Sequence, residues 1–585
     1  MKNLTIKCGL LFRLFSQRCN FCSGLLTLII FLSALSAMGQ VNTEWTAIYQ
    51  SPFQQVDYGR KIKVDASGNV YVGGHSKIDD QGNSKVVILK YDAAGNLLWV
   101  YNNDSTTDIM EDMVMDNEGN IYYTGYRWAV ATSEWNLLTV KVNISGDEVW
   151  SSTYDGNGFG LGWDYGMALT LDAEGNVYTV GYGAAVSYNG YDFEIVKYNN
   201  DGTQQWEANW HNPVDSDLSS NYFNEAYRVK VDDQGNLFVS GYTFNGVDDE
   251  LTLLKFNTDG NLLWTKSYDT KANWPEIWDN RNFMKIDAND NIYMAGEVRD
   301  STHGCDILLL KYDSTGALLW SKAWNSTGND SDYVSGDFYD EEGLAFDNTG
   351  NIFVSGTITN PNTEFREDIV TLKYNPDGDL IWTNTFNGIG NDEDRPYSIA
   401  TDNLGNVYVC GESANSHGIG TMDYITFKLD GGTGTQVWKK TFNGAADFYD
   451  EAHSIFVDPQ NNVYVTGYSG TNNDPFNFHA EIVTIKYSQA PTGLNEIADQ
   501  MNATIFPNPS GDATTLQLSL KQQESISIYV LNELGETVIT LPEMNLQSGA
   551  HQLNFDTQRL PNGMYRVELV SDGNVQSENI SVVHN

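Results

Sequence analysis

The chain has 585 residues, a formal net charge of −44 at pH 7, 12% aromatic residues and only 19% charged residues. This length allows one large domain and a smaller one. The glycine- and aromatic-rich composition excludes a disordered chain and favours a compact β-rich protein. Nucleic acid and anionic membranes carry the same sign of charge as the protein, so the sequence predicts neither as a partner.

The N-terminus has the features of an export signal. Four basic residues precede an apolar run from Leu25 to Leu35, and the small residues Ala37 and Gly39 follow it. We therefore expect a signal peptide over 1–39, with Gln40 starting the mature chain, whose net charge would be −48. The apolar run is too short for a membrane span, and none is predicted in the mature chain.

Eight copies of one pattern, about fifty-six residues apart, follow the signal. Each copy has an apolar strand that ends in Asp, a turn of the form x-x-Gly-Asn, and a second strand that ends in Gly. Repeats of this length indicate stacked units that cannot bury their faces alone. The turn residues are Asp65, Asp116, Asp172, Asp232, Asp287, Asp347, Asp402 and Asp458.

The first copy predicts four antiparallel strands, at 58–64, 70–74, 85–91 and 97–101. Asp and Gly-Asn between them suit tight hairpin turns, where a positive φ is needed. The third strands are almost wholly apolar, as in Val86-Val87-Ile88-Leu89, which indicates burial on both faces. Four such strands per stacked unit are typical of a β-propeller blade.

One Trp recurs in the fourth strand of seven repeats, and the eighth repeat stops after its third strand. Glu44-Trp45-Thr46 resembles a fourth strand, so we expect the N-terminal strand to complete the last blade and leave no free edge. The predicted fold is all-β, an eight-bladed propeller over 40–488. The Trp residues assigned this structural role are Trp45, Trp99, Trp150, Trp206, Trp264, Trp320, Trp382 and Trp438.

A Lys ends every third strand. Antiparallel pairing should bring Lys90 near Asp65, and the same pair is expected in every repeat, partly buried and structural in role. The other members are Lys141, Lys197, Lys255, Lys311, Lys373, Lys428 and Lys486.

The motif Asp-x-x-Gly-Asn-Val-Tyr-x-x-Gly, followed by Leu-Lys-Tyr-Asp-x-x-Gly-x-Leu-x-Trp, resembles the SBBP class of β-propeller repeats of secreted bacterial proteins. The likeness covers about 41–488 and implies a fold without a single chemistry. The Trp-bearing segments also look like those of eight-bladed quinoprotein dehydrogenases. Those enzymes use adjacent cysteines, and this sequence has no Cys-Cys pair.

The periodicity ends at a linker over 489–503. From 504 to 585 the chain has Pro507-Asn508-Pro509, short alternating strands and Asn562-Gly563-Met564-Tyr565, a pattern that predicts a small β-sandwich. This segment resembles the type A C-terminal sorting domain of the type IX secretion system of Bacteroidetes. The resemblance implies contact with the secretion machinery, passage through the outer membrane, removal of the tail, and a propeller released or attached at the cell surface.

Two sets of residues are candidates for ligand binding. The variable second-to-third loops and the links between blades should share one face, where binding residues usually lie, and their aromatic side chains suit sugar rings or protein partners. These residues include Trp128, Trp135, Trp163, Trp274 and Trp278. The alternative is that they pack the loops onto the blades.

The second set is a ring of carboxylates eight residues before the turn Asp. It could bind Ca²⁺ or a polyhydroxylated ligand, or each member could bond backbone amides of the neighbouring blade. The members are Asp57, Asp108, Asp164, Asn224, Asp279, Asp394 and Asp450, with Asp340 one position later. No other cofactor is predicted.

The sequence favours a non-enzymatic binding module for glycan or protein. It contains no nucleophile elbow, zinc-protease motif or phosphate loop, and His75 and His453 belong to a scattered set without metal spacing. No catalytic residue is therefore assigned. A polysaccharide lyase or glycosidase with its site at the channel mouth is the alternative, and a structural or adhesive surface protein is the third. Cys305, placed just before a strand, and Cys410 are expected to be separate thiols.

Overall fold

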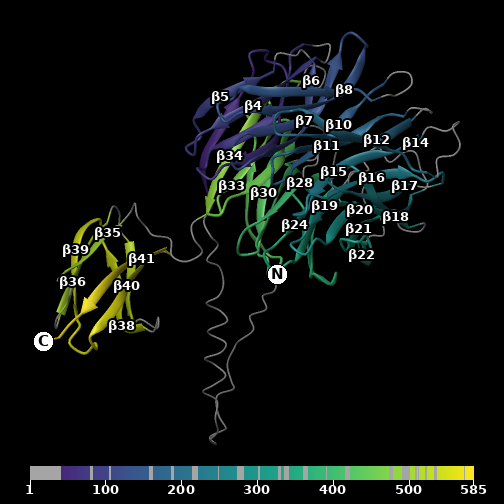
Figure 1. Cartoon of the computed structure of the whole chain (residues 1–585). Helices are drawn as coiled ribbons and strands as arrows, with labels where there is room; N and C mark the ends of the chain where they lie inside the picture. The colour runs from purple at the N-terminus through teal and green to yellow at the C-terminus, as the bar shows by residue number, and fades with distance from the viewer. Residues whose placement is uncertain are drawn as a thin grey trace, which may run out of the picture. The chain divides into compact units, whose positions relative to one another are not determined.

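The computed structural model describes residues 41–79, 83–103, 107–156, 162–185, 190–213, 222–247, 249–272, 282–300, 304–326, 331–334, 342–359, 367–390, 392–415, 422–472, 478–489, 501–506, 510, 513–520, 524–532, 537–571 and 574–584. All regular elements in these ranges are β-strands (Figure 1). The chain divides into a large unit, Gln40–Gln489, and a second unit that contains Ala490–Asn585. No helix in the described ranges has the length and apolarity needed to span a bilayer.

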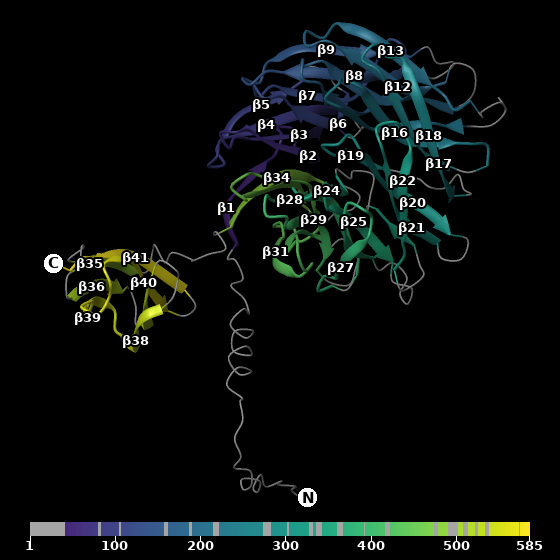
Figure 2. The ribbon, with the colours of Figure 1, turned by 60° about the horizontal axis from the view of Figure 1, so that its bottom comes forward.

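The described part of the large unit contains eight sheets built on four antiparallel strands, and two of these sheets include a fifth, short strand (Figures 1 and 2). The first three are β2 (Asp57–Val64), β3 (Val70–Lys77), β4 (Ser84–Tyr91), β5 (Leu97–Asn102); β6 (Asp108–Met115), β7 (Ile121–Ala129), β8 (Glu134–Val142), β9 (Glu148–Tyr154); and β10 (Tyr165–Leu171), β11 (Val177–Ala184), β12 (Gly190–Tyr198), β13 (Gln204–Trp210). The short strand β14 (Tyr222–Phe223) adds to the third sheet, parallel to β12.

The next four sheets follow the same order. They are β15 (Glu225–Val231), β16 (Leu237–Phe244), β17 (Asp249–Phe256), β18 (Leu262–Ala272); β19 (Phe283–Ile286), β20 (Ile292–Asp300), β21 (Gly304–Tyr312), β22 (Leu318–Trp324); β23 (Asp332–Tyr333) with β24 (Leu344–Phe346), β25 (Ile352–Thr359), β26 (Glu367–Tyr374), β27 (Leu380–Phe386); and β28 (Asp394–Thr401), β29 (Val407–Ala414), β30 (Met422–Leu429), β31 (Gln436–Phe442). The last sheet is β32 (Asp450–Val457), β33 (Val463–Gly470), β34 (Ala480–Gln489) and β1 (Val41–Tyr49).

The first strands of the sheets surround a common cavity. Strand β2 contacts β6, and the contacts continue in chain order through β10, β15, β19, β24, β28 and β32, which contacts β2 again. The cavity between them has a volume of about 420 Å³ and is lined by all eight of these inner strands. Buried apolar side chains fill the space between neighbouring sheets. This arrangement is that of a β-propeller.

The turn Asp of each repeat holds the turn that it opens. Asp65 Oδ1 accepts a hydrogen bond from the backbone N–H of Asn69, and Asp65 Oδ2 accepts one from the Asn69 side chain. Gly68 has a φ of 79°, where a side chain would be strained. In the fifth and eighth repeats Asp290 and Asn461 take this place, with φ of 58° and 63°, because Asp and Asn tolerate the left-handed region.

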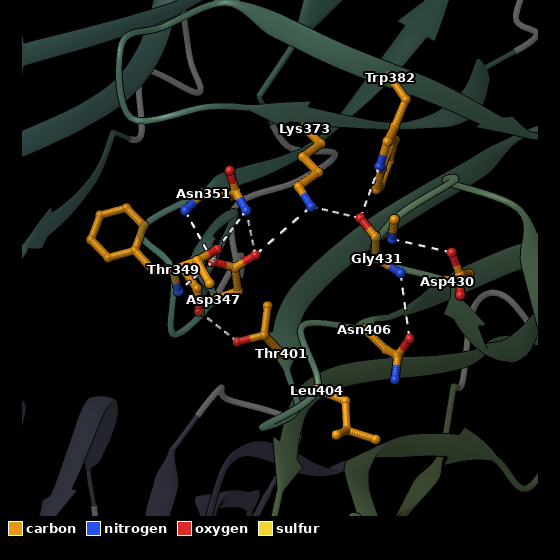
Figure 3. A network of polar contacts seen from close by, with 12 residues as sticks. Asp347, Thr349, Asn351, Lys373, Trp382, Thr401, Leu404, Asn406, Asp430 and Gly431 are labelled. Carbon is orange, nitrogen blue, oxygen red and sulfur yellow. Dashed lines mark hydrogen bonds and ion pairs between the residues drawn. The ribbon is translucent and has the colours of Figure 1, made fainter. Parts of the chain in front are cut away.

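Neighbouring sheets are joined through one carbonyl group. Figure 3 displays the contact between the sixth and seventh repeats, where Lys373 Nζ and Trp382 Nε1 both donate to the carbonyl of Gly431, at 2.6 and 3.1 Å. Gly431 follows Asp430, which opens the third-to-fourth turn of the next repeat. We call this pair of donors the Lys–Trp clamp. It recurs as Lys90 and Trp99 on Ile144, Lys197 and Trp206 on Thr258, and Lys311 and Trp320 on Pro376.

Two repeats vary the clamp. Trp150 Nε1 donates to the carbonyl of Asn200, whereas Lys141 Nζ donates to its side-chain oxygen. Lys255 donates to the carbonyl of Ser314 at 3.2 Å. The acceptor residue occupies the same turn position in each case, so each sheet is hydrogen-bonded to this turn of the next sheet.

The clamp Lys also lies over an aromatic ring of the second strand in every repeat. Its Nζ is 4.6 to 5.4 Å from the ring centroid. The ion pair predicted for every repeat comes within 4.0 Å in only three of these eight pairs. They are Lys255–Asp232, Lys373–Asp347 and Lys428–Asp402. The Lys therefore binds mainly a carbonyl and a π-face, and the turn Asp is satisfied by its own turn.

The N-terminal strand takes the outer position in the last sheet. Strand β1 pairs with β34 and places Trp45 opposite Lys486 (Figure 2). Trp45 Nε1 and Lys486 Nζ donate to the carbonyl of Ala93, at 3.1 and 3.4 Å. The Trp45 ring packs on Gly95, whose φ is 85° and where a Cβ would lie 2.6 Å from the ring. The last and first repeats thus use the same clamp as the others.

The seventh repeat meets a sheet that has no third-to-fourth turn, because β1 is not continuous with β34. Gln489 supplies the missing acceptor: its Oε1 accepts from Lys428 Nζ at 2.8 Å and from Trp438 Nε1 at 3.2 Å. Its amide nitrogen donates to the carbonyl of Asn461 at 2.7 Å. A side chain here replaces a backbone carbonyl.

The two cysteines of the large unit are free and buried. Cys305 lies within β21 and not in the loop before a strand, because β20 and β21 stay paired down to Asp300 and Gly304. Burial raises the pKa of Cys305 to about 11, which makes it a poor nucleophile at neutral pH.

The second unit is described by two antiparallel sheets that share one core. One contains β35 (Met501–Phe506), β36 (Ala513–Leu520) and β39 (Gly549–Asp556); the other contains β37 (Glu524–Leu531), β38 (Thr537–Leu546), β40 (Gly563–Ser571) and β41 (Asn574–Val582). Leu516 and Phe555 of the first sheet join Ile528, Val567 and Ile580 of the second in a buried cluster.

Replacing Gln489 by Ala should lower the free energy of unfolding by about 2–4 kcal/mol. The substitution leaves the donors of Lys428 and Trp438 without their common acceptor in a half-buried setting. Urea unfolding followed by Trp fluorescence measures the change. Gln436, exposed on β31, provides the matched control, and its replacement by Ala should change stability by less than about 0.5 kcal/mol. Equal effects of the two substitutions would contradict the role of Gln489.

Candidate functional site

The predicted carboxylate ring lies at the start of the inner strands but is fully buried. Asp57, Asp108, Asp164, Asp394 and Asp450 each have 0% of their surface exposed, as does Asn224. Asp394 Oδ2 accepts from the backbone N–H of Gly388 at 2.6 Å, and Asp450 Oδ2 from that of Gly444 at 2.7 Å. Asp57 and Asp164 bond Ser51 and Gly156 in the same way. Each of these carboxylates therefore hydrogen-bonds to the backbone of the segment that connects the previous sheet to its own inner strand.

Asp108 makes a different contact. Its carboxylate accepts from Nε and Nη2 of Arg127, at 3.0 and 2.7 Å, and from the Asn103 side chain. The Arg127 side chain is 26% exposed, whereas the Asp108 side chain is not exposed. The second repeat therefore presents a fixed guanidinium at its loop edge.

Asp332 occupies the ring position in the sixth repeat. Asp332 pairs opposite Ile358, as Asp57 pairs opposite Ser76, and its carboxylate accepts from the N–H of Ser326 at 2.6 Å. The inner strand of this repeat is split into β23 and β24, so Asp332 precedes its turn Asp by fifteen residues instead of eight. Asp340 and Asp279 lie outside the described residues.

Trp128 and Trp135 lie on paired strands and not in a loop. Strands β7 and β8 continue past their expected ends, and the two residues face each other in register, with ring centroids 5.1 Å apart. Trp135 also meets Tyr126 edge to face at 5.0 Å. Both Trp side chains are half-buried. The repeated pattern predicts that the second strand ends at its Gly, which would put both residues in a loop. In the structure the pairing of β7 with β8 continues beyond that Gly.

The rings continue into the third repeat. Tyr126 contacts Tyr165 at 4.8 Å, Tyr165 contacts Tyr182 at 5.2 Å, and Tyr182 contacts Tyr191 at 5.2 Å. Tyr191 then meets Phe223, which is 48% exposed. We call this chain of rings the aromatic arc: Tyr126, Trp128, Trp135, Tyr165, Tyr182, Tyr191 and Phe223. It spans β7, β8, β10, β11, β12 and β14 on the edge where the loops lie.

Trp163 borders the aromatic arc, directly before the buried Asp164. Its side chain is half-buried, and its indole N–H has no hydrogen-bond partner among the described residues. The other two predicted Trp residues, Trp274 and Trp278, lie outside the described residues. The structure thus brings Trp128 and Trp135 together with Tyr191 and Phe223, which belong to the same predicted set of loop aromatics. It also adds Tyr126, Tyr165 and Tyr182, which the sequence did not single out.

A second cluster lies on the first and second strands of the first and eighth repeats and on the first strand of the seventh repeat. Tyr58 contacts His75 at 5.0 Å and Tyr468 at 5.1 Å between ring centroids, and His453 stacks on Tyr397 at 4.7 Å. His453 contacts Tyr468 at 5.5 Å. We call Tyr58, His75, Tyr397, His453 and Tyr468 the histidine cluster. Both histidines are almost fully buried.

Charged groups surround the histidine cluster. The Glu451 carboxylate lies 3.1 Å from His453 Nε2 and accepts a hydrogen bond from the Tyr468 hydroxyl. Burial lowers the pKa of His75 well below its usual value, and Arg60, Lys77 and His453 act in the same direction. His75 is therefore neutral at physiological pH, while Glu451 supplies a negative charge on the other side.

Arg395 forms a further charged group beside the cluster. Its guanidinium reaches Glu367 at 2.5 Å, Glu412 at 3.3 Å and Glu393 at 3.4 Å. The three carboxylates satisfy the guanidinium, so Arg395 acts in this state as a structural cation. Among the described residues, no group of three or more His, Cys, Asp or Glu side chains is placed to hold a metal ion.

The repeat register contains a signal that could have located the histidine cluster. His75 and Tyr468 each stand ten residues after their turn Asp, and Tyr58 and Glu451 each stand seven residues before it. Residues at equal offsets in adjacent repeats lie side by side around the ring. The spacing of the histidines along the chain alone does not reveal this proximity, because it depends on the offset of each residue from its own turn Asp.

Family comparisons identify two parts of the chain. Residues 504–583 match the family described as the secretion system C-terminal sorting domain, and residues 388–418 match the family described as the beta-propeller repeat. The chain therefore carries an SBBP-type propeller repeat and a type IX secretion sorting domain at its C-terminal end. Both resemblances inferred from the sequence are confirmed.

One curated relative and several solved structures are similar over larger spans. An uncharacterized WD repeat-containing protein, L264, of Acanthamoeba polyphaga mimivirus is 22% identical over 555 residues, which cover 78% of this chain and 35% of the relative. The chain thus spans about a third of that relative's length.

Among solved structures, PorZ, a surface component of the type-IX secretion system of Porphyromonas gingivalis, is 12% identical with a TM-score of 0.36, covering 88% of this chain and 64% of PorZ. Polysaccharide lyase Uly1 is 10% identical with a TM-score of 0.38, covering 76% of this chain and 99% of the lyase. The propeller domain of the Trilobed protease from Pyrococcus furiosus is 8% identical, at 0.37, covering 68% and 98%. Likeness at this level transfers no activity to this chain.

The buried carboxyls predict a pH dependence of stability. Burial raises the pKa of Asp450 to about 6 in the folded protein, from an ordinary value of 3.8. A raised pKa in the folded state stabilises the fold at low pH, and this contribution is lost as pH rises through about 6. Two pKa units correspond to about 3 kcal/mol. Asp450→Asn should remove this contribution, so its stability should change less than that of the wild type between pH 4.5 and pH 7.

Denaturant unfolding at pH 4.5 and pH 7.0 measures the effect. Asp377→Asn, at an exposed turn residue, is the matched control and should retain the wild-type difference. If Asp450→Asn also keeps the full difference, the buried carboxyl is not the titrating group.

Proposed function

We propose that this protein is an exported, eight-bladed β-propeller that binds a glycan through the aromatic arc. The observation that carries the proposal is the arc itself, an unbroken series of rings on the second and third repeats. Side chains that serve only the fold should be the same in every repeat. A ligand site needs a few repeats to differ from the rest.

The aromatic arc has the properties of a carbohydrate-binding surface. Its rings contact one another at 4.8 to 5.4 Å, three pairs edge to face and three pairs tilted, which fixes them before a ligand arrives and lowers the entropic cost of binding. Half-buried rings offer apolar faces to the C–H surface of a sugar. Arg127 and Asn136 are paired on the same hairpin, next in sequence to Trp128 and Trp135, and place polar groups on its other face at the same edge.

The closed ring gives this surface a rigid base. Support comes from the cycle of contacts among the inner strands, the pairing of β1 with β34, and the Trp45 contact to Ala93. We infer that the last blade joins both ends of the propeller segment. Such closure removes the free sheet edges.

Export is the context of this binding role. A type IX sorting domain at 504–583 directs a protein out of the cell, and we propose that a signal peptide over 1–39 precedes this step. The sorting domain would contact the secretion machinery and then be removed, so that the propeller is released or held at the outer surface. The high negative charge suits solubility there.

Replacing Trp135 by Ala should weaken glycan binding about 30-fold or more. Truncation of a central aromatic contact typically costs about 2 kcal/mol. A glycan array probed with the full chain identifies the ligand, and titration calorimetry with that glycan compares the variants. Phe53→Ala, at an exposed aromatic residue outside the arc, should bind as the wild type does. Absence of any glycan binding, or equal loss in both variants, would contradict the proposal.

The histidine cluster favours a second candidate, a polysaccharide-cleaving enzyme. A neutral His75, the Tyr468 hydroxyl and the nearby cation Arg60 are groups used in proton transfer and charge stabilisation. Against it, these side chains are buried and bonded to one another. Incubation with polysaccharides distinguishes the two functions. Cleavage that His453→Gln abolishes without loss of the folded state would replace the binding role by an enzymatic one.

A further inference from the structure

The cavity between the inner strands has the opposite charge to the rest of the protein. The chain as a whole carries −44, but the cavity is lined by six basic side chains and three acidic ones. The basic residues are Arg60, Lys61, Lys63, Arg228, Lys230 and Lys285. The low dielectric constant of the protein around a cavity strengthens the electrostatic potential that such charges produce inside it.

The three acidic residues neutralise only part of this charge. Arg60 pairs with Glu111 at 3.1 Å, Lys61 with Asp112 at 3.4 Å, and Lys285 with Glu342 at 2.8 Å. Arg228 lies over the Phe283 ring at 5.0 Å and donates to the Tyr227 carbonyl.

Two ammonium groups have no carboxylate of their own in this cavity. Among the described residues, no carboxylate lies within 4.0 Å of Lys63 or Lys230. Burial lowers the pKa of Lys230, and Lys285 and Lys63 lower it further. Burial alone would raise the pKa of Glu342, but Lys285, Lys230 and Lys63 bring it below its usual value. Three lysines from two sides of the cavity therefore act on one another and on Glu342, and Lys63 and Lys230 also act on the Asp112 carboxylate.

The lysines are not part of the structural repeat. Lys63, Lys230 and Lys285 each stand two residues before their turn Asp, on β2, β15 and β19. At the same position the other repeats have small or uncharged residues: Val114, Thr170, Ala345, Ala400 and Phe456. The fold forms without a charge at this position, so three converging ammonium groups require a different explanation.

We propose that the central cavity binds a multivalent oxoanion group, phosphate or sulfate, between Lys63, Lys230 and Lys285. An anion with two negative charges balances the two ammonium groups that have no carboxylate within reach, and it removes the repulsion among the three lysines. A volume of about 420 Å³ holds such a group together with water. This site is separate from the aromatic arc, so it does not depend on the proposed glycan.

Titration calorimetry of the full chain with sodium phosphate and sodium sulfate, at constant ionic strength, tests the site. We expect saturable binding of one anion per chain, and at least a tenfold loss of affinity in Lys63→Gln combined with Lys230→Gln. Lys439→Gln removes an exposed lysine of β31 and should bind as the wild type does. No saturable binding to either anion, or undiminished binding by the double variant, overturns the proposal.

Thermal unfolding gives an independent measurement that also reports whether the variants fold. Without anion, the double variant should melt at the same or a higher temperature than the wild type, because the repulsion is removed. With anion, only the wild type and Lys439→Gln should gain stability, by mass action. A double variant that melts lower without anion, or gains as much with it, contradicts the assignment. Competition between a sulfated oligosaccharide and phosphate would identify a pendant sulfate group as the source, and lack of competition a free ion.

Discussion

The structure depends on one contact that recurs around the ring, the Lys–Trp clamp on a carbonyl of the next repeat. Each sheet buries apolar faces against its neighbours, but apolar packing alone does not fix the angle or register between sheets. Two donors directed at a single backbone oxygen do so, because hydrogen bonds are directional. The acceptor is a backbone group, so the turn sequence can vary from Ile144 to Pro376 without loss of the contact.

The last junctions explain why the clamp matters for the whole ring. The propeller segment begins with β1 and ends with β34. The last sheet therefore has no turn that joins its third and fourth strands. Gln489 provides an acceptor for the seventh repeat, and Trp45 provides the donor for the eighth. The same geometry is thus built from residues distant in sequence. Positions occupied by the same residue type in all repeats serve this architecture. The two sites proposed for ligands, the aromatic arc and the central cavity, lie at positions where a few repeats carry different side chains from the rest.

The sequence predicted what the repeat encodes and missed what depends on departures from it. Strand order, turns and the Trp positions follow from a pattern seen eight times. Asp332 was missed because an insertion moves it away from the common offset, and Asp340 was named in its place. Trp128 was placed in a loop because pairing continues beyond the Gly that ends the pattern. His75 and Tyr468 meet only when the ring brings the first and last repeats together.

The central claim is that the N-terminal strand completes the last sheet and so closes the ring. Deleting residues 41–49 and then adding a synthetic peptide of that sequence tests it most directly. The deletion should lower the melting temperature, and the peptide should restore it in a saturable manner, whereas a peptide with Trp45→Ala should restore less. An unchanged melting temperature after the deletion would contradict the account.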